Sequence, residues 1–95
     1  MVQLTAKQRA RIAQQVFEPT ADDRRILKAL AASRGTLVQV AIEEATRISR
    51  KTVGKRLRVM LRYNLLHYPH GARKGAAITP EGRELLEAPE LANAT

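Results

Sequence analysis

The stretch from residue 47 to residue 63, RISRKTVGKRLRVMLRY, constrains the fold of this chain more than any other. Placed on a helix at about 100° per residue, its apolar side chains gather on one face and its basic side chains on roughly the opposite face. The apolar face comprises Val53, Leu57, Met60 and Leu61, and the basic face comprises Lys51, Lys55, Arg58 and Arg62. We therefore predict an amphipathic helix whose apolar face is buried and whose basic face is exposed.

Residues at both ends of this helix indicate where it begins and where it ends. Ser49 is a good N-cap, because its hydroxyl can accept a hydrogen bond from a free amide of the first turn. Ile48 and Val53 flank the cap and can close a hydrophobic staple. Asn64 tolerates the left-handed conformation in which many helices end. The predicted helix occupies about residues 49–63.

Positive charge is concentrated around this helix. The chain has a formal net charge of +8 and a pI of about 10.9. Residues 45–80 hold nine Lys and Arg side chains and no Asp or Glu. The acidic residues are Glu18, Asp22, Asp23, Glu43, Glu44, Glu81, Glu84, Glu87 and Glu90. Such segregation gives a directed positive field suited to a polyanion, and the alternative is a merely solvated basic surface.

Length and composition exclude several classes of protein. The 95 residues make one domain, 1–95, with a small core and no deep substrate pocket. Aromatic residues are only 3% of the chain, so the core consists of Leu, Ile, Val and Ala, which favours helices packed on helices. Without Cys there is neither a disulfide framework nor a thiolate metal site. No apolar run approaches the roughly 20 residues of a membrane span, and the first residues lack a signal-peptide core. We expect a cytoplasmic protein without a membrane partner.

The first residues predict a helix over 5–17. Thr5 and Gln8 fit a capping box. The helix carries a narrow apolar stripe formed by Ile12, Ala13, Val16 and Phe17. Because a helix this short is marginal on its own, we expect the stripe to pack on its own domain or on the second subunit of a homodimer.

Residues 20–34 predict the next helix. Thr20 is its N-cap, and Asp22 and Asp23 are first-turn charges that the helix dipole favours. Its buried stripe is Ile26, Leu27 and Leu30. Gly35 stands where a C′ glycine is expected, so we place the end of the helix just before it.

A short helix precedes the basic one. Thr36 and Gln39 fit a second capping box, although Thr36 and Leu37 could instead form a very short strand. The inward residues of this helix are Ala41, Ile42 and Ala45. A tight connection at residues 46–47 leads to the basic helix, and two helices joined this closely are typical of a helix-turn-helix.

After the basic helix the pattern is that of a β-hairpin. Residues 65–68 and 76–78 suit two strands, and residues 70–75 form a polar, glycine-bounded loop with a basic tip. Thr79 and Pro80 then start a last helix, as N-cap and first helical residue. This helix has an apolar edge of Leu85 and Leu86 and is stopped by Pro89, after which residues 89–95 form a tail.

This order of elements resembles the winged helix-turn-helix domains of bacterial and archaeal transcription regulators, above all the MarR-like and ArsR-like groups. The resemblance covers about residues 22–87, with IEEATRISRKTVGKRLRVMLRYNLL and AITPEGRELL as its best matches. It implies a mainly α fold with a small β-hairpin wing: a three-helix core at 20–88, the wing, and flanking N- and C-terminal helices.

Three positions depart from the pattern of these families. Arg47 occupies the turn where glycine is usual, and a left-handed arginine would cost about 1 kcal/mol or more. We therefore expect a turn of different shape. Glu43 replaces a small buried residue, which suggests a slightly rotated second helix. Asn64 stands where glycine is common.

The resemblance also implies roles in binding double-stranded DNA. Lys51 and Lys55 would contact bases in the major groove, followed by Arg50 and Thr52 on bases or phosphates. The other implied contacts are Gly54 for close approach to DNA or to a neighbouring helix, Arg58 and Arg62 on phosphates, and Arg73 and Lys74 of the wing on the minor groove or backbone. Gly54 could equally be a tolerated substitution, and Arg56 a solvated charge.

Other chemistry has little support in the sequence. His67 and His70 lack a third candidate metal ligand, and His70 fits better near a phosphate. Tyr63 and Tyr68 are expected to buttress helix against wing. With no nucleophile–base constellation and no phosphate loop, we predict a protein that is not an enzyme and has no metal or cofactor.

The prediction is a sequence-specific, nucleoid-associated DNA-binding protein, homodimeric and a transcriptional regulator. The helix at 49–63 would enter the major groove, and the wing at 65–78 would lie on the minor groove or backbone. One alternative is a plasmid or phage protein that uses this fold architecturally, in replication or segregation. Another is a module that docks on a protein. RNA binding is weaker, because a protruding helix does not suit the deep, narrow RNA major groove.

Overall fold

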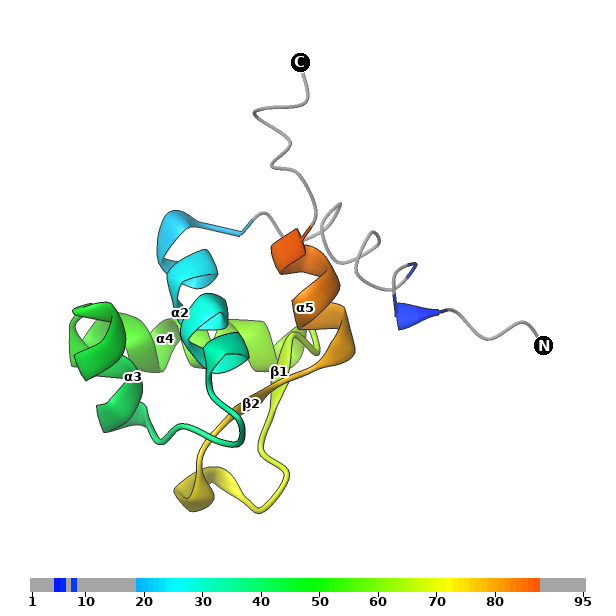
Figure 1. Ribbon diagram of the computed structural model, residues 1–95. Helices are drawn as coiled ribbons and strands as arrows, with labels where there is room; N and C mark the ends of the chain where they lie inside the picture. The colour runs from blue at the N-terminus through cyan, green and yellow to red at the C-terminus, as the bar shows by residue number, and fades with distance from the viewer. Residues whose placement is uncertain (1–4, 7, 9–18, 88–95) are drawn as a thin grey trace.

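The computed structural model describes residues 5, 6, 8 and 19–87 (Figure 1). Helices pack around one core, and a short antiparallel hairpin projects from it (Figure 1). The elements are α2 (Ala21–Ala32), α3 (Gln39–Thr46), α4 (Arg50–Arg62), β1 (Leu66–His67), the 3-10 helix η1 (Ala72–Lys74), β2 (Ala77–Ile78) and α5 (Pro80–Glu87). The mainly α fold with a small hairpin is thus confirmed.

Most of the predicted N-terminal helix lies outside the described residues, and so does the tail at 89–95. The capping box that opens this helix is present. The Thr5 amide donates to Gln8 Oε1 at 2.9 Å, and the Gln8 amide donates to Thr5 Oγ1 at 3.1 Å. These reciprocal bonds confirm the predicted cap at the start of the segment.

The core is aliphatic, as the low aromatic content predicts. Its fully buried side chains come from α2, α3, α4 and α5, from β1 and from the residue just before β1: Ile26, Leu27, Leu30, Ile42, Val53, Met60, Leu65, Leu66 and Leu85. Leu61 was predicted on the buried face of α4, and this prediction is wrong because 44% of the residue is exposed. The buried stripe of α4 follows Val53, Leu57 and Met60, spaced by four and three residues, and is narrower than the predicted apolar face.

α2 begins as predicted but ends early. Thr20 and Asp23 form a capping box, with Asp23 N donating to Thr20 Oγ1 at 3.1 Å and Thr20 N donating to Asp23 Oδ2 at 2.9 Å. The helix ends at Ala32, and Ser33 is already extended at φ −78° and ψ 141°. Gly35 is therefore not a left-handed C′ residue, and the predicted end at residue 34 was wrong. The Ser33 hydroxyl accepts from the Gly35 amide at 3.3 Å, a local bond that competes with the helix.

Of the two conformations predicted for Thr36 and Leu37, a helix cap or a very short strand, the structure favours the strand. Val38 is the N-cap and makes no side-chain cap bond, so the predicted Thr36 capping box is wrong. The Thr36 hydroxyl instead donates to Lys74 O at 2.8 Å. Leu37 pairs with Ala76 through N–H···O bonds of 2.9 and 2.8 Å. The chain before α3 is thereby joined to the edge of the hairpin.

The inward face of α3 is also shifted from the prediction. Ala45 is exposed, and Thr46 is buried in its place. A buried threonine needs a partner for its hydroxyl. Thr46 Oγ1 donates to Ile42 O at 2.7 Å and accepts from Ile48 N at 3.3 Å. The end of α3 is therefore anchored by a polar residue that the apolar pattern could not reveal.

The hairpin has the predicted place and a shorter ladder. Leu66 pairs with Ile78, and His67 pairs with Ala77. Its loop contains η1, which the sequence did not predict. Gly75 has φ +101°, and a Cβ there would lie 2.8 Å from the backbone of Leu37. Only glycine allows the hairpin to approach the chain before α3 this closely.

The turn into the hairpin and the start of α5 agree with the sequence. Asn64 is left-handed at φ 60°. The Thr79 hydroxyl accepts from Gly82 N at 2.9 Å, as an N-cap does, and donates to Asn64 O at 2.7 Å. A Cβ on Gly82 would lie 2.2 Å from Leu65 O, so α5 packs directly on the backbone that enters β1.

Candidate nucleic-acid interface

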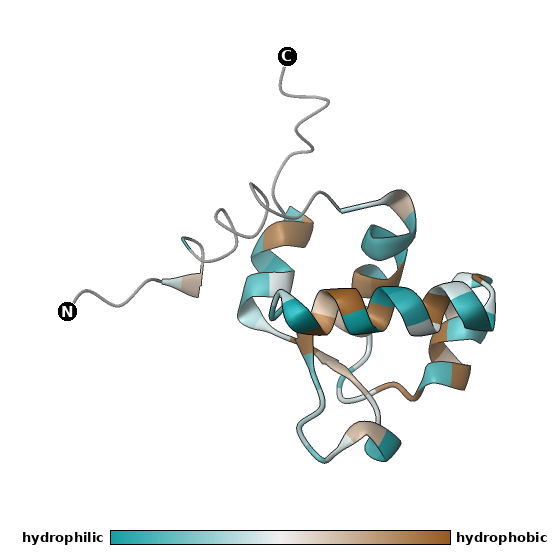
Figure 2. Cartoon of the chain, turned by 180° about the vertical axis from the view of Figure 1, so that it is seen from behind, coloured by the Kyte–Doolittle hydropathy of each residue, from teal (hydrophilic) through white to brown (hydrophobic). Residues whose placement is uncertain are grey.

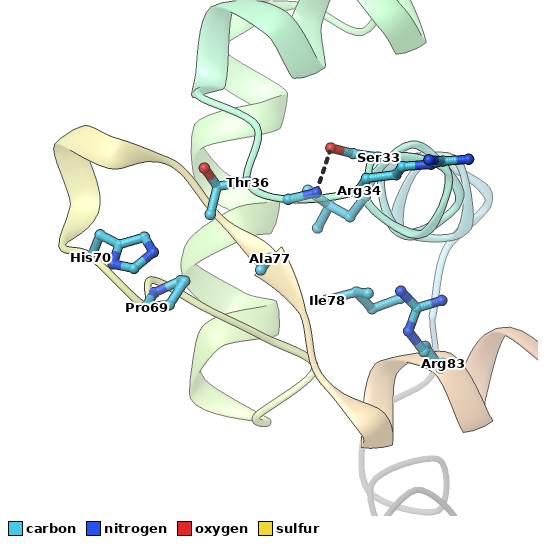
Figure 3. Close-up of a pocket in the computed structure, with 10 residues that line it drawn as sticks. Ser33, Arg34, Thr36, Pro69, His70, Ala77, Ile78 and Arg83 are labelled. Atoms are coloured by element: carbon cyan, nitrogen blue, oxygen red, sulfur yellow. Dashed lines mark hydrogen bonds between the residues drawn. The ribbon is translucent and has the colours of Figure 1, made fainter.

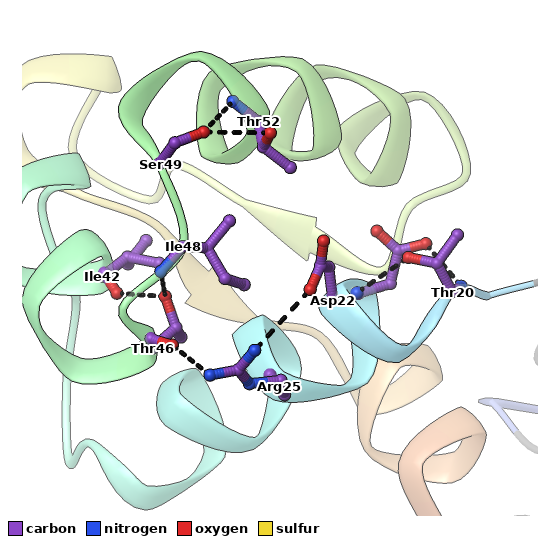
Figure 4. Close-up of polar contacts among 9 residues, drawn as sticks. Thr20, Asp22, Arg25, Ile42, Thr46, Ile48, Ser49 and Thr52 are labelled. Atoms are coloured by element: carbon purple, nitrogen blue, oxygen red, sulfur yellow. Dashed lines mark hydrogen bonds and ion pairs between the residues drawn. The ribbon is translucent and has the colours of Figure 1, made fainter.

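The turn between α3 and α4 has the shape that glycine usually provides. Arg47 is left-handed at φ 59° and ψ 26°, and its amide donates to Glu43 O at 2.8 Å. The expectation that arginine would reshape this turn was wrong. Bonds on either side of Arg47 hold it, because Thr46 contacts both Ile42 and Ile48, and the Arg25 guanidinium donates to Thr46 O (Figure 4). These contacts offset the cost of the left-handed residue.

α4 starts as predicted. The Ser49 hydroxyl accepts from Thr52 N at 3.3 Å and donates to Thr52 Oγ1 at 3.0 Å (Figure 4). Ile48 and Val53 are both buried beneath this cap, in agreement with the staple. The first turn of α4 is therefore fixed from both sides, while Ser49 itself faces solvent.

One face of α4 presents positive charge to solvent. Polar and apolar residues alternate along the helix with the period of its turns (Figure 2). The exposed basic side chains of the predicted face are Lys51, Lys55, Arg58 and Arg62. Among the described residues, none of these four forms an ion pair with an acid of the chain. This face is therefore available to a polyanion.

The other predicted contacts lie at two further places. Arg73 and Lys74 are exposed on η1, at the end of the hairpin that projects away from the helices (Figure 1). Thr52 and Gly54 are half-buried on α4. A Cβ on Gly54 would lie 3.4 Å from Gln39 Nε2, so the glycine faces α3. Of the predicted alternatives for Gly54, the geometry favours close approach between helices.

Arg56 is not a solvated charge. Its Nε donates to Asp23 Oδ1 at 2.6 Å and a terminal nitrogen donates to Asp23 Oδ2 at 2.7 Å. Asp23 is fully buried, and only 19% of the Arg56 side chain is exposed. The hydrogen bond to Asp23 raises the pKa of Arg56, while burial acts in the opposite direction. Asp23 is correspondingly more than a first-turn charge, since it joins α2 to α4.

Arg50, at the first position of α4, lies between the basic face and α3. Its Nε lies 3.7 Å from Glu43 Oε1, and its carbonyl oxygen accepts from Gln39 Nε2 at 3.2 Å. The Arg50 side chain is 76% exposed, so the ion pair leaves it accessible. The sequence singled out Arg50 and Glu43 separately, and nothing in the helical pattern indicated that they meet.

The two tyrosines and the two histidines near the wing differ in burial. Tyr63 and Tyr68 are partly buried against the core, as buttressing residues would be. Burial raises the pKa of Tyr68 above its ordinary value of 10.0. His67 and His70 are exposed. In the described part of the chain, no three His, Cys, Asp or Glu side chains come together as a metal site would require.

An open groove of about 320 Å³ lies between the end of α2, the hairpin and the start of α5 (Figure 3). Leu30 and Ile78 line it, together with the basic residues Arg34, His70 and Arg83. The sequence did not predict this groove, because its walls come from three segments far apart in the chain. Within residues 5, 6, 8 and 19–87, no helix has the length and apolar character to cross a bilayer.

No protein-family model matches the sequence, and neither does any curated protein. Solved structures do match. The crystal structure of MepR, a transcription regulator of the Staphylococcus aureus multidrug efflux pump MepA, aligns with a TM-score of 0.65 and 27% identity over 86% of this chain and 63% of MepR. A MepR variant from a multidrug-resistant S. aureus clinical isolate aligns with a TM-score of 0.64 and 28% identity over 85% of this chain and 62% of that one.

The fold is a winged helix-turn-helix, the fold of the transcription regulator MepR. α3 and α4 form its helix-turn-helix, and the β1–β2 hairpin with η1 is its wing. The predicted resemblance to MarR-like regulators is confirmed, and the similar structures are those of a regulator and not of an enzyme. The chain spans less than two thirds of MepR.

Proposed function

We propose that this winged helix binds double-stranded DNA sequence-specifically and belongs to a transcriptional regulator. The observation that carries the proposal is the exposed basic face of α4, whose Lys51, Lys55, Arg58 and Arg62 are solvent-exposed and do not form ion pairs with acids of the described chain. A fixed helix with such a face suits the major groove, where phosphates supply affinity and base edges supply sequence choice.

We assign contacts with bases and contacts with phosphates by position along α4. Arg50, Lys51 and Thr52 occupy the first turn, and Lys55 lies one turn further on the same exposed side. In helix-turn-helix proteins the N-terminal residues of this helix contact base edges. Arg58 and Arg62 lie beyond the middle of the helix and would contact phosphates. Gly54 adds no side chain to the interface, and we assign it to the contact with α3.

The wing would supply a second contact. Arg73 and Lys74 are adjacent, exposed and carried by a loop that Gly71 and Gly75 bound at positive φ. Thr36 and Leu37 join this loop to the chain before α3. The wing is therefore held in a defined place, from which its two cations can contact the minor groove or the backbone.

We further propose that residues 1–95 form a single domain with its core at 20–88. Two copies of this domain would assemble as a homodimer. The predicted apolar stripe within 5–17 and the apolar edge of α5, Leu85 and Leu86, are the basis of this proposal. Leu86 is half-buried and supports it, whereas Leu85 is buried in the core of its own chain and cannot contribute. A two-fold dimer would bind two half-sites about 10 base pairs apart, or a multiple of that distance. Such a protein would act on the nucleoid in the cytoplasm. Sedimentation as a monomer at high micromolar concentration would contradict the dimer.

Selection of bound sequences from a random double-stranded DNA pool, at moderate salt, tests this function. We expect an enriched palindrome whose half-sites have the stated spacing. Enrichment of a site that maps to an origin rather than a promoter would instead favour an architectural or replication role. Weak binding without any enriched sequence would contradict DNA recognition and favour a module that docks on a protein partner.

A further inference from the structure

Two side chains of α3 contact the first residue of α4. Gln39 Nε2 donates to the backbone oxygen of Arg50 at 3.2 Å, and Glu43 Oε1 lies 3.7 Å from Arg50 Nε. Gln39 and Glu43 are four residues apart, so they lie on the same face of α3. One face of this helix thus contacts both the backbone and the side chain of Arg50.

Glu43 is in an unfavourable place for a residue that only stabilises the fold. Its side chain is 19% exposed, whereas that of Arg50 is 76% exposed. Its Oε2 atom is buried and has no hydrogen-bond partner. A buried carboxylate oxygen without a hydrogen bond is costly, and an ion pair with an exposed arginine offsets little of that cost. Such a group in a native fold calls for an explanation other than stability.

The geometry of the ion pair suggests that explanation. The guanidinium atom of Arg50 that lies closest to Glu43 Oε1 is Nε, the nitrogen bonded to the aliphatic part of the side chain. No described residue accepts a hydrogen bond from the two terminal nitrogens of Arg50, the atoms with which an arginine contacts guanine O6 and N7. Glu43 therefore attracts the guanidinium of Arg50 towards α3 and favours one orientation of the side chain, while the terminal nitrogens keep their capacity to donate hydrogen bonds to a base.

We propose that Glu43 is a positioning residue for DNA recognition: it holds the Arg50 guanidinium at the start of α4 so that its terminal nitrogens contact one guanine. This inference rests on the proposed DNA-binding function and assigns Arg50 a single base pair within the site. Gln39 fixes the backbone from which the side chain starts. A long, exposed arginine loses less rotamer freedom on binding when its orientation is already set.

The test uses the full chain and a DNA site enriched by the wild-type protein, with each G·C pair replaced in turn. Arg50→Ala should abolish the preference for guanine at one position. Glu43→Gln keeps the shape of the side chain and removes its charge. It should reduce the preference at that same position by about five- to tenfold, within the range that a bidentate contact provides. In the Arg50→Ala background, Glu43→Gln should change nothing further at that position.

Glu44→Gln is the matched control, because Glu44 is the exposed acid next along α3. It removes the same charge and should leave every base preference unchanged. If Glu43→Gln and Glu44→Gln raise the affinity for all sequences equally, Glu43 acts only by repelling phosphates and the proposal is wrong.

Thermal melting separates positioning from a structural role. We expect Glu43→Gln to melt no lower than the wild type, since glutamine keeps the side-chain shape and removes the charge from a mostly buried carboxylate whose Oε2 atom has no hydrogen bond. A lower melting temperature together with unaltered base preferences would overturn the proposal. If the wild-type chain enriches no sequence at all, the proposed function itself fails, and the assignment of Arg50 and Glu43 fails with it.

Discussion

The carboxylate of Asp23, at the start of α2, accepts two hydrogen bonds from the guanidinium of Arg56, in the middle of α4. The same carboxylate accepts a hydrogen bond from the backbone amide of Thr20 in the capping box. Asp23 thus determines where α2 begins and also holds α2 against α4. Because α4 carries the proposed DNA-binding face, this buried ion pair fixes that face relative to the rest of the domain.

The ion pair should contribute strongly to stability. Asp23→Ala removes the buried carboxylate that accepts two hydrogen bonds from Arg56 and also the bond by which Asp23 accepts the Thr20 amide in the capping box. We therefore expect the free energy of unfolding to fall by about 3 kcal/mol or more. Urea denaturation followed by circular dichroism measures this loss. Asp22→Ala is the control, because Asp22 pairs with Arg25 at 3.8 Å on the surface and should cost less than about 1 kcal/mol. Equal losses in the free energy of unfolding would show that the buried ion pair contributes no more to stability than the surface pair.

The contact between α5 and the entry to the hairpin should tolerate no side chain at Gly82. A methyl group there would lie 2.2 Å from Leu65 O, which belongs to the backbone and cannot rotate away. We expect Gly82→Ala to destabilise the domain by about 2 kcal/mol or more, as overpacking does. Gly35→Ala is the control, since nothing lies within 4 Å of a Cβ at that position. Comparable melting temperatures for the two variants would contradict the described packing.

Gly54 should be replaceable by alanine. It lies inside a helix, and a Cβ would make an ordinary 3.4 Å contact with Gln39 Nε2. We expect Gly54→Ala to raise the free energy of unfolding by about 0.5–1 kcal/mol, because alanine is the better helix former. DNA affinity should not change, since the new methyl group faces α3. An affinity loss in a stabilised variant would mean instead that DNA approaches the helix at Gly54.

Burial of Tyr68 should produce a dependence of stability on alkaline pH. Its pKa is raised above 10.0 by desolvation, so the folded state holds the phenolic proton more tightly than the unfolded chain does. The corresponding stability is complete below pH 10.0 and is lost as the pH rises towards the raised value. Phenolate absorbance of Tyr63→Phe, in which Tyr68 is the remaining tyrosine, should show a midpoint above 10.0. A midpoint at or below the ordinary value would contradict this burial.

Features that depend on neighbouring residues in the chain were predicted well. Ser49 and Thr79 cap their helices as expected, Asn64 is left-handed, and the basic helix spans Arg50–Arg62 where 49–63 was predicted. Each depends on a side chain that bonds a backbone group within a few residues, or on a backbone preference of one residue. Such signals can be read from the sequence alone.

Features that depend on contacts between distant residues were missed. Arg56 and Asp23 are separated by 33 positions, and only the packed helices bring them together. Thr46 replaces Ala45 in the core because its hydroxyl finds partners there, which an apolar pattern cannot show. The left-handed Arg47 is stabilised by the same contacts. For the candidate site, the sequence located the basic face, but the pairing of Arg50 with Glu43 required the angle between α3 and α4.

The most direct test of the account compares Lys55→Ala with Lys28→Ala in binding to the DNA sequence that the wild-type protein selects. Both lysines are exposed, and each substitution removes one positive charge, but Lys55 lies on α4 and Lys28 on α2. We predict that Lys55→Ala weakens binding by about tenfold, as loss of a base contact does, while Lys28→Ala changes it little. Equal effects of the two substitutions on affinity would contradict the assignment of α4 as the DNA-binding helix.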